Sequence, residues 1–131
     1  MKGALVLLSL TMLAACQGAL LNAQKPVSAG ILSGEYEESR ALVRSKYDGK
    51  EITVSGYTLT VPSLPRSSAD QGSVLLEEKG RDPAGQVTCW FSREQTAEFS
   101  KIKGGQHLTV KGVFNGEAGA ELKFCKLVKD E

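Results

Sequence analysis

The spacing of apolar and polar residues separates an export segment from the rest of the chain. Residues 3–15 are uncharged and mostly apolar, and they follow the positive Lys2. This layout is typical of a secretory signal. The segment has about 13 residues, whereas a membrane-spanning helix needs about 20. We therefore expect residues 1–15 to direct export and not to form a permanent membrane helix.

Residues 17–32 combine Gly, Pro and small polar residues without a sustained period. This composition predicts a tether of residues 16–32 that leads to a folded domain. An alternative is that the apolar residues of this stretch pack on the domain or on a membrane surface; they are Leu20, Leu21, Ile31 and Leu32. Composition alone leaves both interpretations open.

Residues 33–47 have the spacing of a helix, with Tyr36, Val43 and Tyr47 near one stripe. Ser33 can cap the amino end; acidic residues then occupy the first turns, and basic residues occupy the last. Gly49 is expected to end the helix. The charges fit a solvated face better than a binding site.

After Gly49 the apolar and polar residues alternate, which predicts β-strands. The predicted strands are residues 50–61, 73–79, 86–92, 107–114 and 120–128. A short helix is expected within residues 92–105, before the Gly104-Gly105 pair. Five strands with a helix between the third and the fourth is the order of an oligonucleotide/oligosaccharide-binding (OB) barrel. The prediction is therefore a mainly β fold, an OB barrel with a leading helix over residues 33–131.

Four segments resemble, in their order and spacing, a family of small exported bacterial OB-fold proteins called tRNA_anti-like. They are residues 47–56, 87–91, 103–112 and 122–128. The resemblance implies an OB fold over most of the chain after the signal. The family name records a similarity to a tRNA anticodon-binding domain and implies no tRNA binding here. The resemblance brings no catalytic residues with it.

The signal ends in Leu13-Ala14-Ala15-Cys16, which resembles a bacterial lipobox. The resemblance implies that the Cys16 thiol receives a diacylglyceryl group and that the signal is cut between Ala15 and Cys16. Two or more acyl chains hold a protein firmly on a membrane. Gln17 stands where an Asp would suggest retention at the inner membrane, so the outer membrane, facing the periplasm, is favoured. The alternative is an ordinary signal peptide, although no good A-x-A cleavage site precedes Cys16.

Two cysteines, Cys89 and Cys125, remain once Cys16 is assigned to lipid. In an exported bacterial protein an even remainder predicts a disulfide. A structural zinc site would lack ligands, because His107 is the only histidine and no C-x-x-C motif is present. The OB order makes the third and fifth strands neighbours, which supports the pair. Cys125 is out of phase with Leu122, so the last strand needs a bulge or a change of buried face.

Charge and motifs exclude several classes of function. Removal of the first 15 of 131 residues takes away one basic residue, Lys2, and leaves 116 residues with 15 basic and 15 acidic side chains. This balance disfavours a general nucleic-acid binder. The sequence has no Gly-rich phosphate loop and no nucleophile elbow. Glu77 and Glu78 are adjacent on a strand and so point to opposite faces. We expect no enzyme, no metal and no cofactor.

OB barrels usually bind through the face of their second and third strands and the loops beside it. Here the loops are about residues 61–72 and 115–119. Tyr57 and Trp90 could offer stacking surfaces on that face, and Arg66 could reach in from the loop. The alternative is that Trp90 is partly buried and Tyr57 only lines the barrel wall. A single-strand platform needs several aromatic residues with basic residues between them, and this chain has few aromatic residues.

The resulting hypothesis is a non-catalytic OB-fold protein, anchored by Cys16 to the bacterial envelope, that binds a protein or another envelope component. The alternative is a binder of a small molecule or saccharide through the face of the second and third strands. Single-stranded nucleic acid ranks third.

Overall fold

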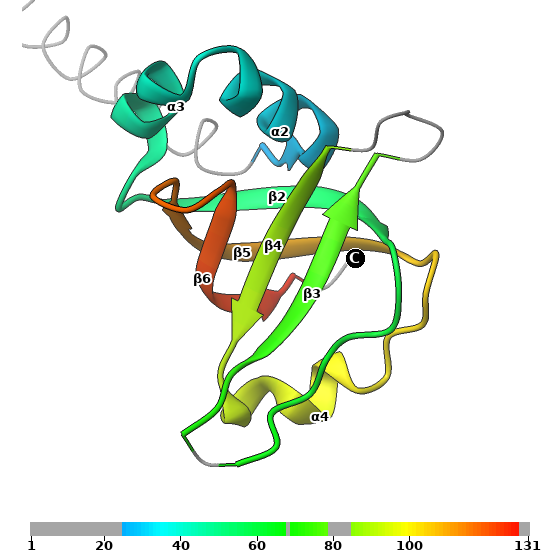
Figure 1. The fold of residues 1–131 in the computed structure, drawn as a ribbon. Coiled ribbons are helices and arrows are strands. Elements are labelled where there is room, and N and C mark those ends of the chain that lie inside the picture. Colours follow the sequence, from blue (N-terminus) through cyan, green and yellow to red (C-terminus); the bar gives the residue numbers. More distant parts are fainter. Residues whose placement is uncertain (1–24, 68, 79–84, 129–131) are drawn as a thin grey trace, which may run out of the picture.

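Six strands and three α-helices make up the part of the chain that the computed structural model describes, which is residues 25–67, 69–78 and 85–128 (Figure 1). The elements in chain order are β1 (Val27–Ser28), α2 (Ala29–Glu38), α3 (Arg40–Tyr47), β2 (Glu51–Thr58), β3 (Gly72–Glu77), β4 (Gln86–Phe91), the short 3-10 helix η1 (Arg93–Gln95), α4 (Thr96–Phe99), β5 (His107–Asn115) and β6 (Glu121–Leu127).

Five of the strands close into a barrel in the order β2–β3–β4–β6–β5, and β5 pairs with β2 to complete the ring. The β4–β6 pair is parallel, and the other four pairs are antiparallel. A short helix joins β4 to β5. The predicted OB arrangement of five strands with a helix between the third and the fourth is confirmed.

Helices cover both ends of the barrel (Figure 1), and buried side chains fill its interior. At the end covered by α4, the rings of Phe91 and Phe99 stack with centroids 4.1 Å apart, and both are buried. At the other end Tyr36 of α2 packs edge-on against Phe114 of β5, with its hydroxyl donating to the Gly116 carbonyl at 2.7 Å. Aromatic side chains are thus packed at both ends of the barrel.

The leading helix ends at Tyr47 as predicted, but it differs from its prediction at the amino end and in the middle. It begins at Ala29, not Ser33, because Ala29 and Leu32 pack fully buried in the core. Residues 27–32, expected in the tether, thus belong to the folded domain. The acidic residues predicted for the first turns lie near the end of α2 instead. The helix breaks at Ser39, whose backbone lies outside the helical region (φ −150°, ψ 81°), and α3 then continues to Tyr47.

The last strand contains the irregularity that the phase of Cys125 requires. Phe124 has a positive φ of 57°, and the register of β5 against β6 shifts between Lys111 and Val113. Two residues of β6, Phe124 and Cys125, therefore face the single residue Gly112 of β5, which is a β-bulge. The bulge turns Cys125 into the core and leaves Phe124 69 % exposed.

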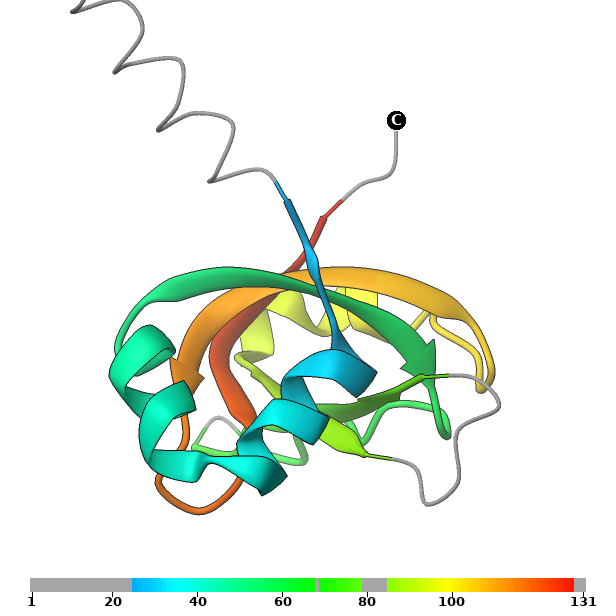
Figure 2. The ribbon, with the colours of Figure 1, turned by 90° about the horizontal axis from the view of Figure 1, so that it is seen from above.

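The two ends of the described chain leave the barrel on one side. β1 and the end of β6 both point out on the side of β2 and β5, whereas β3 and β4 lie on the opposite side (Figure 2). β1 runs parallel to β2, with Val27 beside Val54. No helix of the described residues is long and apolar enough to cross a membrane.

Candidate binding surface

The outer face of β3 and β4 is an uncovered wall of the barrel. Alternate residues of the two strands are buried, and those between them face outward. The outward residues form three cross-strand pairs: Ser73 with Trp90, Leu75 with Thr88, and Glu77 with Gln86. Figure 1 shows no helix in front of this wall. We call these six residues the β3–β4 face.

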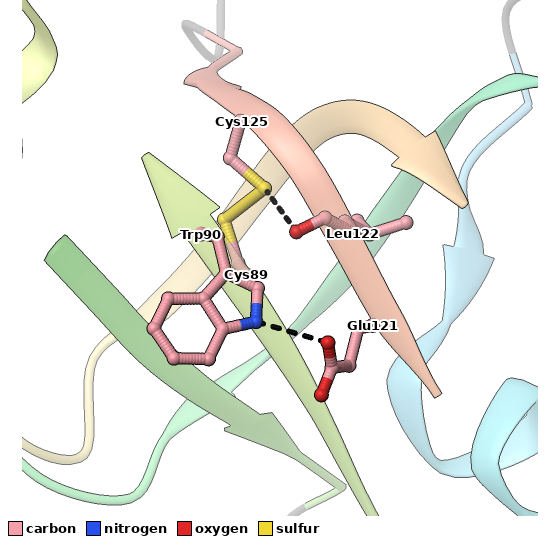
Figure 3. The surroundings of a disulfide bond; sticks show 5 residues. All are labelled: Cys89, Trp90, Glu121, Leu122 and Cys125. Atoms are coloured by element: carbon pink, nitrogen blue, oxygen red, sulfur yellow. Dashed lines mark hydrogen bonds between the residues drawn. A yellow bond between two sulfur atoms is a disulfide. The ribbon is translucent and has the colours of Figure 1, made fainter. Parts of the chain in front are cut away.

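Trp90 is held in place on the β3–β4 face by a neighbour on β6. Its indole N–H donates to a carboxylate oxygen of Glu121 at 3.1 Å (Figure 3). The ring is half-buried, as one of the sequence interpretations allowed. Because the hydrogen bond fixes the indole, the exposed part of the ring keeps one position on the wall.

The predicted disulfide between Cys89 and Cys125 is present directly behind Trp90 (Figure 3). Both cysteines are fully buried, and their Cα atoms lie 6.0 Å apart. β4 and β6 pair through only two residue pairs, Thr88 with Glu121 and Cys89 with Leu122. The disulfide therefore adds a covalent link to one of the two shortest ladders of the barrel, the other being β2–β3.

Tyr57 lies at the opposite end of the same wall. It is paired with Glu77 of β3, four residues from Ser73, the partner of Trp90. At about 3.3 Å per residue, the two aromatic residues are roughly 13 Å apart along the strands. The Tyr57 ring packs edge-on against His107, with centroids 5.0 Å apart. Tyr57 and Trp90 thus do not form one stacking platform.

Arg66 lies exposed in the loop between β2 and β3, nearer to Trp90 than to Tyr57 along the sheet. Two backbone hydrogen bonds of 2.9 Å join Ser63 of this loop to Ser73, the residue opposite Trp90. The Arg66 backbone N–H donates to Asp70 at 3.2 Å. The structure thus places the loop, but not Tyr57, at the Trp90 end of the wall.

Two further features were not found from the sequence. One is the wall formed by β5 and β6, where Phe124 lies exposed among lysines from two strands. The other is an open hollow of about 380 Å³ between α4, the start of β5 and the end of β6, with Lys101, His107 and Leu127 in its lining. The hollow collects residues from separate elements, and the wall depends on the bulge that turns Phe124 to the same outer face as Lys123 and Lys126.

The ion pair of Arg44 and Asp48 is part of a link between two elements of the fold. The Arg44 Nε–H donates to Asp48 at 2.7 Å, and the other oxygen of Asp48 accepts the Gly116 N–H at 2.9 Å. The hydrogen bond from Arg44 lowers the pKa of Asp48, and that from Gly116 adds to the effect, while desolvation opposes it. These bonds connect the end of α3 to the turn between β5 and β6.

The structure does not test two of the sequence predictions, the lipidation of Cys16 and the absence of a bound metal. Cys16 and its cleavage site lie outside the described residues. Within the described residues, no three acidic, histidine or cysteine side chains cluster as metal ligands would.

The comparison with known protein families agrees with the barrel. The profile of the tRNA_anti-like family matches residues 14–127. The chain belongs to the tRNA_anti-like family. The resemblance that four segments of the sequence indicated is thereby confirmed, and the match extends further toward the amino end than those segments did.

A solved structure shares the fold of this tRNA_anti-like protein. It is a crystal structure from Klebsiella pneumoniae of a candidate nucleic acid-binding lipoprotein, with a TM-score of 0.69 and 17 % sequence identity. The similarity covers 85 % of this chain and 97 % of the other. At this identity the similarity concerns the fold alone. No curated protein matches the sequence.

Proposed function

We propose that this protein is a non-catalytic, lipid-anchored barrel of the bacterial cell envelope that binds a protein or another envelope component. The anchor rests on the export segment and on Leu13-Ala14-Ala15-Cys16. The solved structure with the same fold is that of a lipoprotein, which supports it. Gln17 favours the outer membrane, with the barrel in the periplasm.

The observation that carries the binding role is Trp90 on the uncovered β3–β4 face. Binding energy at protein interfaces concentrates in a few partly buried anchors, among which Trp is enriched. An anchor that is already fixed loses little side-chain entropy on binding. The hydrogen bond from Trp90 to Glu121 supplies that fixation.

The anchor is tested by Cys16→Ser, which removes the thiol that would be acylated. We expect this variant to lose radiolabelled palmitate and to leave the membrane fraction, whereas Cys89→Ser keeps both. Continued labelling of Cys16→Ser would overturn the lipoprotein proposal.

The binding face is tested by affinity capture from solubilised envelopes with Trp90→Ala. The control is Leu42→Ala, since Leu42 is 66 % exposed on α3, away from the face. We expect one component to be enriched with the wild type and with Leu42→Ala and to be lost with Trp90→Ala. Equal enrichment by all three proteins would remove Trp90 from the binding role.

A saccharide is the second candidate for the same face. Trp90 lies beside the carboxylate of Glu121 and opposite the hydroxyl of Ser73, and an aromatic ring flanked by such groups suits a sugar ring. Binding on a glycan array that Trp90→Ala abolishes would favour this candidate over a protein partner.

Nucleic acid ranks third for this face, although the Klebsiella protein carries that description. Glu77 and Glu121 place carboxylates at its two ends, where a phosphate backbone would need basic side chains. Salt-dependent binding of a generic single strand that Trp90→Ala weakens would reverse this ranking.

A further inference from the structure

The wall formed by β5 and β6 presents basic side chains around an exposed aromatic ring. Lys123 and Lys126 are exposed on β6, and Lys111 of β5 is paired directly with Lys126. The Lys111 Nζ also lies 3.3 Å from a carboxylate oxygen of Glu51 on β2, and this ion pair balances part of the positive charge of Lys111. Within the described residues, Lys123 and Lys126 form no ion pair. The wall therefore keeps a positive character that the balanced total charge conceals.

Phe124 lies between Lys123 and Lys126 in the sequence and is 69 % exposed. Its left-handed backbone (φ 57°) is unusual for a bulky residue. The bulge turns this ring outward while the next residue, Cys125, enters the core. A strained residue that displays an apolar ring is a reason to look for its contact outside the chain.

The strand register places this wall beside the point where the chain enters the barrel. Val27 of β1 is paired with Val54 of β2, Val54 with Val110 of β5, and Val110 with Leu127 of β6. Lys111 and Lys126 form the adjacent row. With neighbouring strands about 4.8 Å apart, β1 is roughly 10 Å from β5 across the sheet. Figure 2 shows β1 leaving the barrel on the side of β2 and β5.

We propose that the β5–β6 wall lies on the anionic phospholipid headgroups of the membrane that holds the Cys16 anchor, with the Phe124 ring in the interface. This inference rests on the proposed lipid anchor. Ten residues separate Cys16 from Val27, and such a chain spans at most about 40 Å even when fully extended. The bilayer therefore stays within about one domain diameter of β1.

The tether explains why so few lysines suffice. Each lysine near an anionic membrane surface strengthens binding by about fivefold, which is little for a free protein. A covalent anchor makes the contact intramolecular, and weak contacts then become populated. Nucleic acid, the other polyanion to consider, would gain no such advantage. An aromatic ring flanked by lysines also matches the interfacial level of a bilayer, where rings insert and basic side chains reach the headgroups.

The test uses the full lipoprotein, extracted from membranes and returned to vesicles by its own anchor. Trp90 is the only tryptophan, so Phe124→Trp in a Trp90→Phe background reports from the wall alone. We expect brominated lipids to lower the fluorescence about twofold in vesicles that contain phosphatidylglycerol, since the ring sits at the headgroup boundary. Val61→Trp in the same background is the control, because Val61 is 67 % exposed in the loop after β2; it should be unaffected.

Charge reversal tests the role of the lysines. Lys123→Glu with Lys126→Glu should abolish the quenching at position 124, whereas Arg66→Glu with Arg93→Glu, which reverses as many charges outside β5 and β6, should preserve it. Thermal unfolding of each variant separates this effect from misfolding.

The other outcomes contradict the inference in distinguishable ways. A protein that floats with vesicles while position 124 stays unquenched keeps the anchor and overturns the membrane contact. A protein that does not float overturns both the anchor and this inference. Oligonucleotide binding that Lys123→Glu with Lys126→Glu abolishes, with position 124 unquenched, would assign the wall to nucleic acid instead.

Discussion

Single residues decide what each wall of this barrel presents. Phe124 turns outward because its backbone adopts the left-handed region, and Trp90 keeps one orientation because Glu121 accepts its N–H. The sequence predicted that a bulge or a change of face was needed near Cys125, since the phase of the buried residues fails there. It could not show which residue would adopt the left-handed backbone, because that depends on the register of β6 against β5.

The strained backbone of Phe124 predicts that glycine is more stable at this position. Left-handed backbone costs an ordinary residue about 1–2 kcal/mol, glycine loses part of that gain through its greater freedom when unfolded, and the exposed ring contributes little burial. We expect Phe124→Gly to raise the free energy of unfolding by roughly 0.5–1 kcal/mol in chemical denaturation. Phe124→Ala, which keeps the strain, should bring no gain. A less stable Phe124→Gly would mean that the ring packs on the domain.

The pair of Arg44 and Asp48 predicts a loss of stability in acid. The pKa of Asp48 in the folded protein is lower than the ordinary value of 3.8, so the unfolded chain binds the proton at a higher pH than the folded one. The stabilisation is therefore complete above about pH 4 and is lost as the pH falls through the lowered pKa. Asp48→Asn and Arg44→Gln should both make the free energy of unfolding depend less steeply on pH below about pH 4. If the free energy of unfolding of both variants falls with decreasing pH as steeply as that of the wild type, other carboxylates cause the acid sensitivity.

The helices and strands match their predictions where the apolar residues are periodic. They differ where contacts between residues distant in the sequence determine the structure. All five barrel strands were predicted, because alternation and turn residues mark them. The start of α2 was not predicted, because no feature of the neighbouring sequence shows that the barrel covers Ala29 and Leu32. The break at Ser39 was missed for a similar reason: the stripe of apolar residues continues through it, and only the closed barrel requires α2 and α3 to turn.

At the same scale the bulge predicts that Gly112 tolerates no side chain. A Cβ atom there would lie 2.9 Å from the Lys123 carbonyl oxygen and 3.0 Å from the Cys125 sulfur. Gly112→Ala should therefore lower the free energy of unfolding by about 1–3 kcal/mol, as overpacking does. Gly119→Ala is the matched control, because nothing lies within 4 Å of its Cβ position. Equal stability of the two variants would show that β6 can shift without cost.

At the scale of the whole molecule, the barrel separates two kinds of surface. The β3–β4 face lies opposite the side on which β1 and the end of β6 leave the domain (Figure 2). The β3–β4 face adjoins the β5–β6 wall through the β4–β6 pair, so a tethered domain that rests on the β5–β6 wall would leave the β3–β4 face beside the contact and accessible. The sequence predicted Trp90 on this face but placed Tyr57 with it, because alternation assigns residues to a face and does not tell how far apart they lie along it. The basic wall was hidden for the related reason that strict alternation would put Phe124 on the face opposite Lys123, and only the bulge places both outward.

The most direct test of the proposed binding role is photocrosslinking in intact cells. A photoreactive residue in place of Gln86, which is exposed on the β3–β4 face, reports contacts there, and one in place of Leu42 on α3 is the control. We predict one discrete crosslinked species from Gln86 that disappears with Trp90→Ala and is absent from Leu42. No species from Gln86, or the same species from both positions, would contradict the assignment of this face as the binding surface.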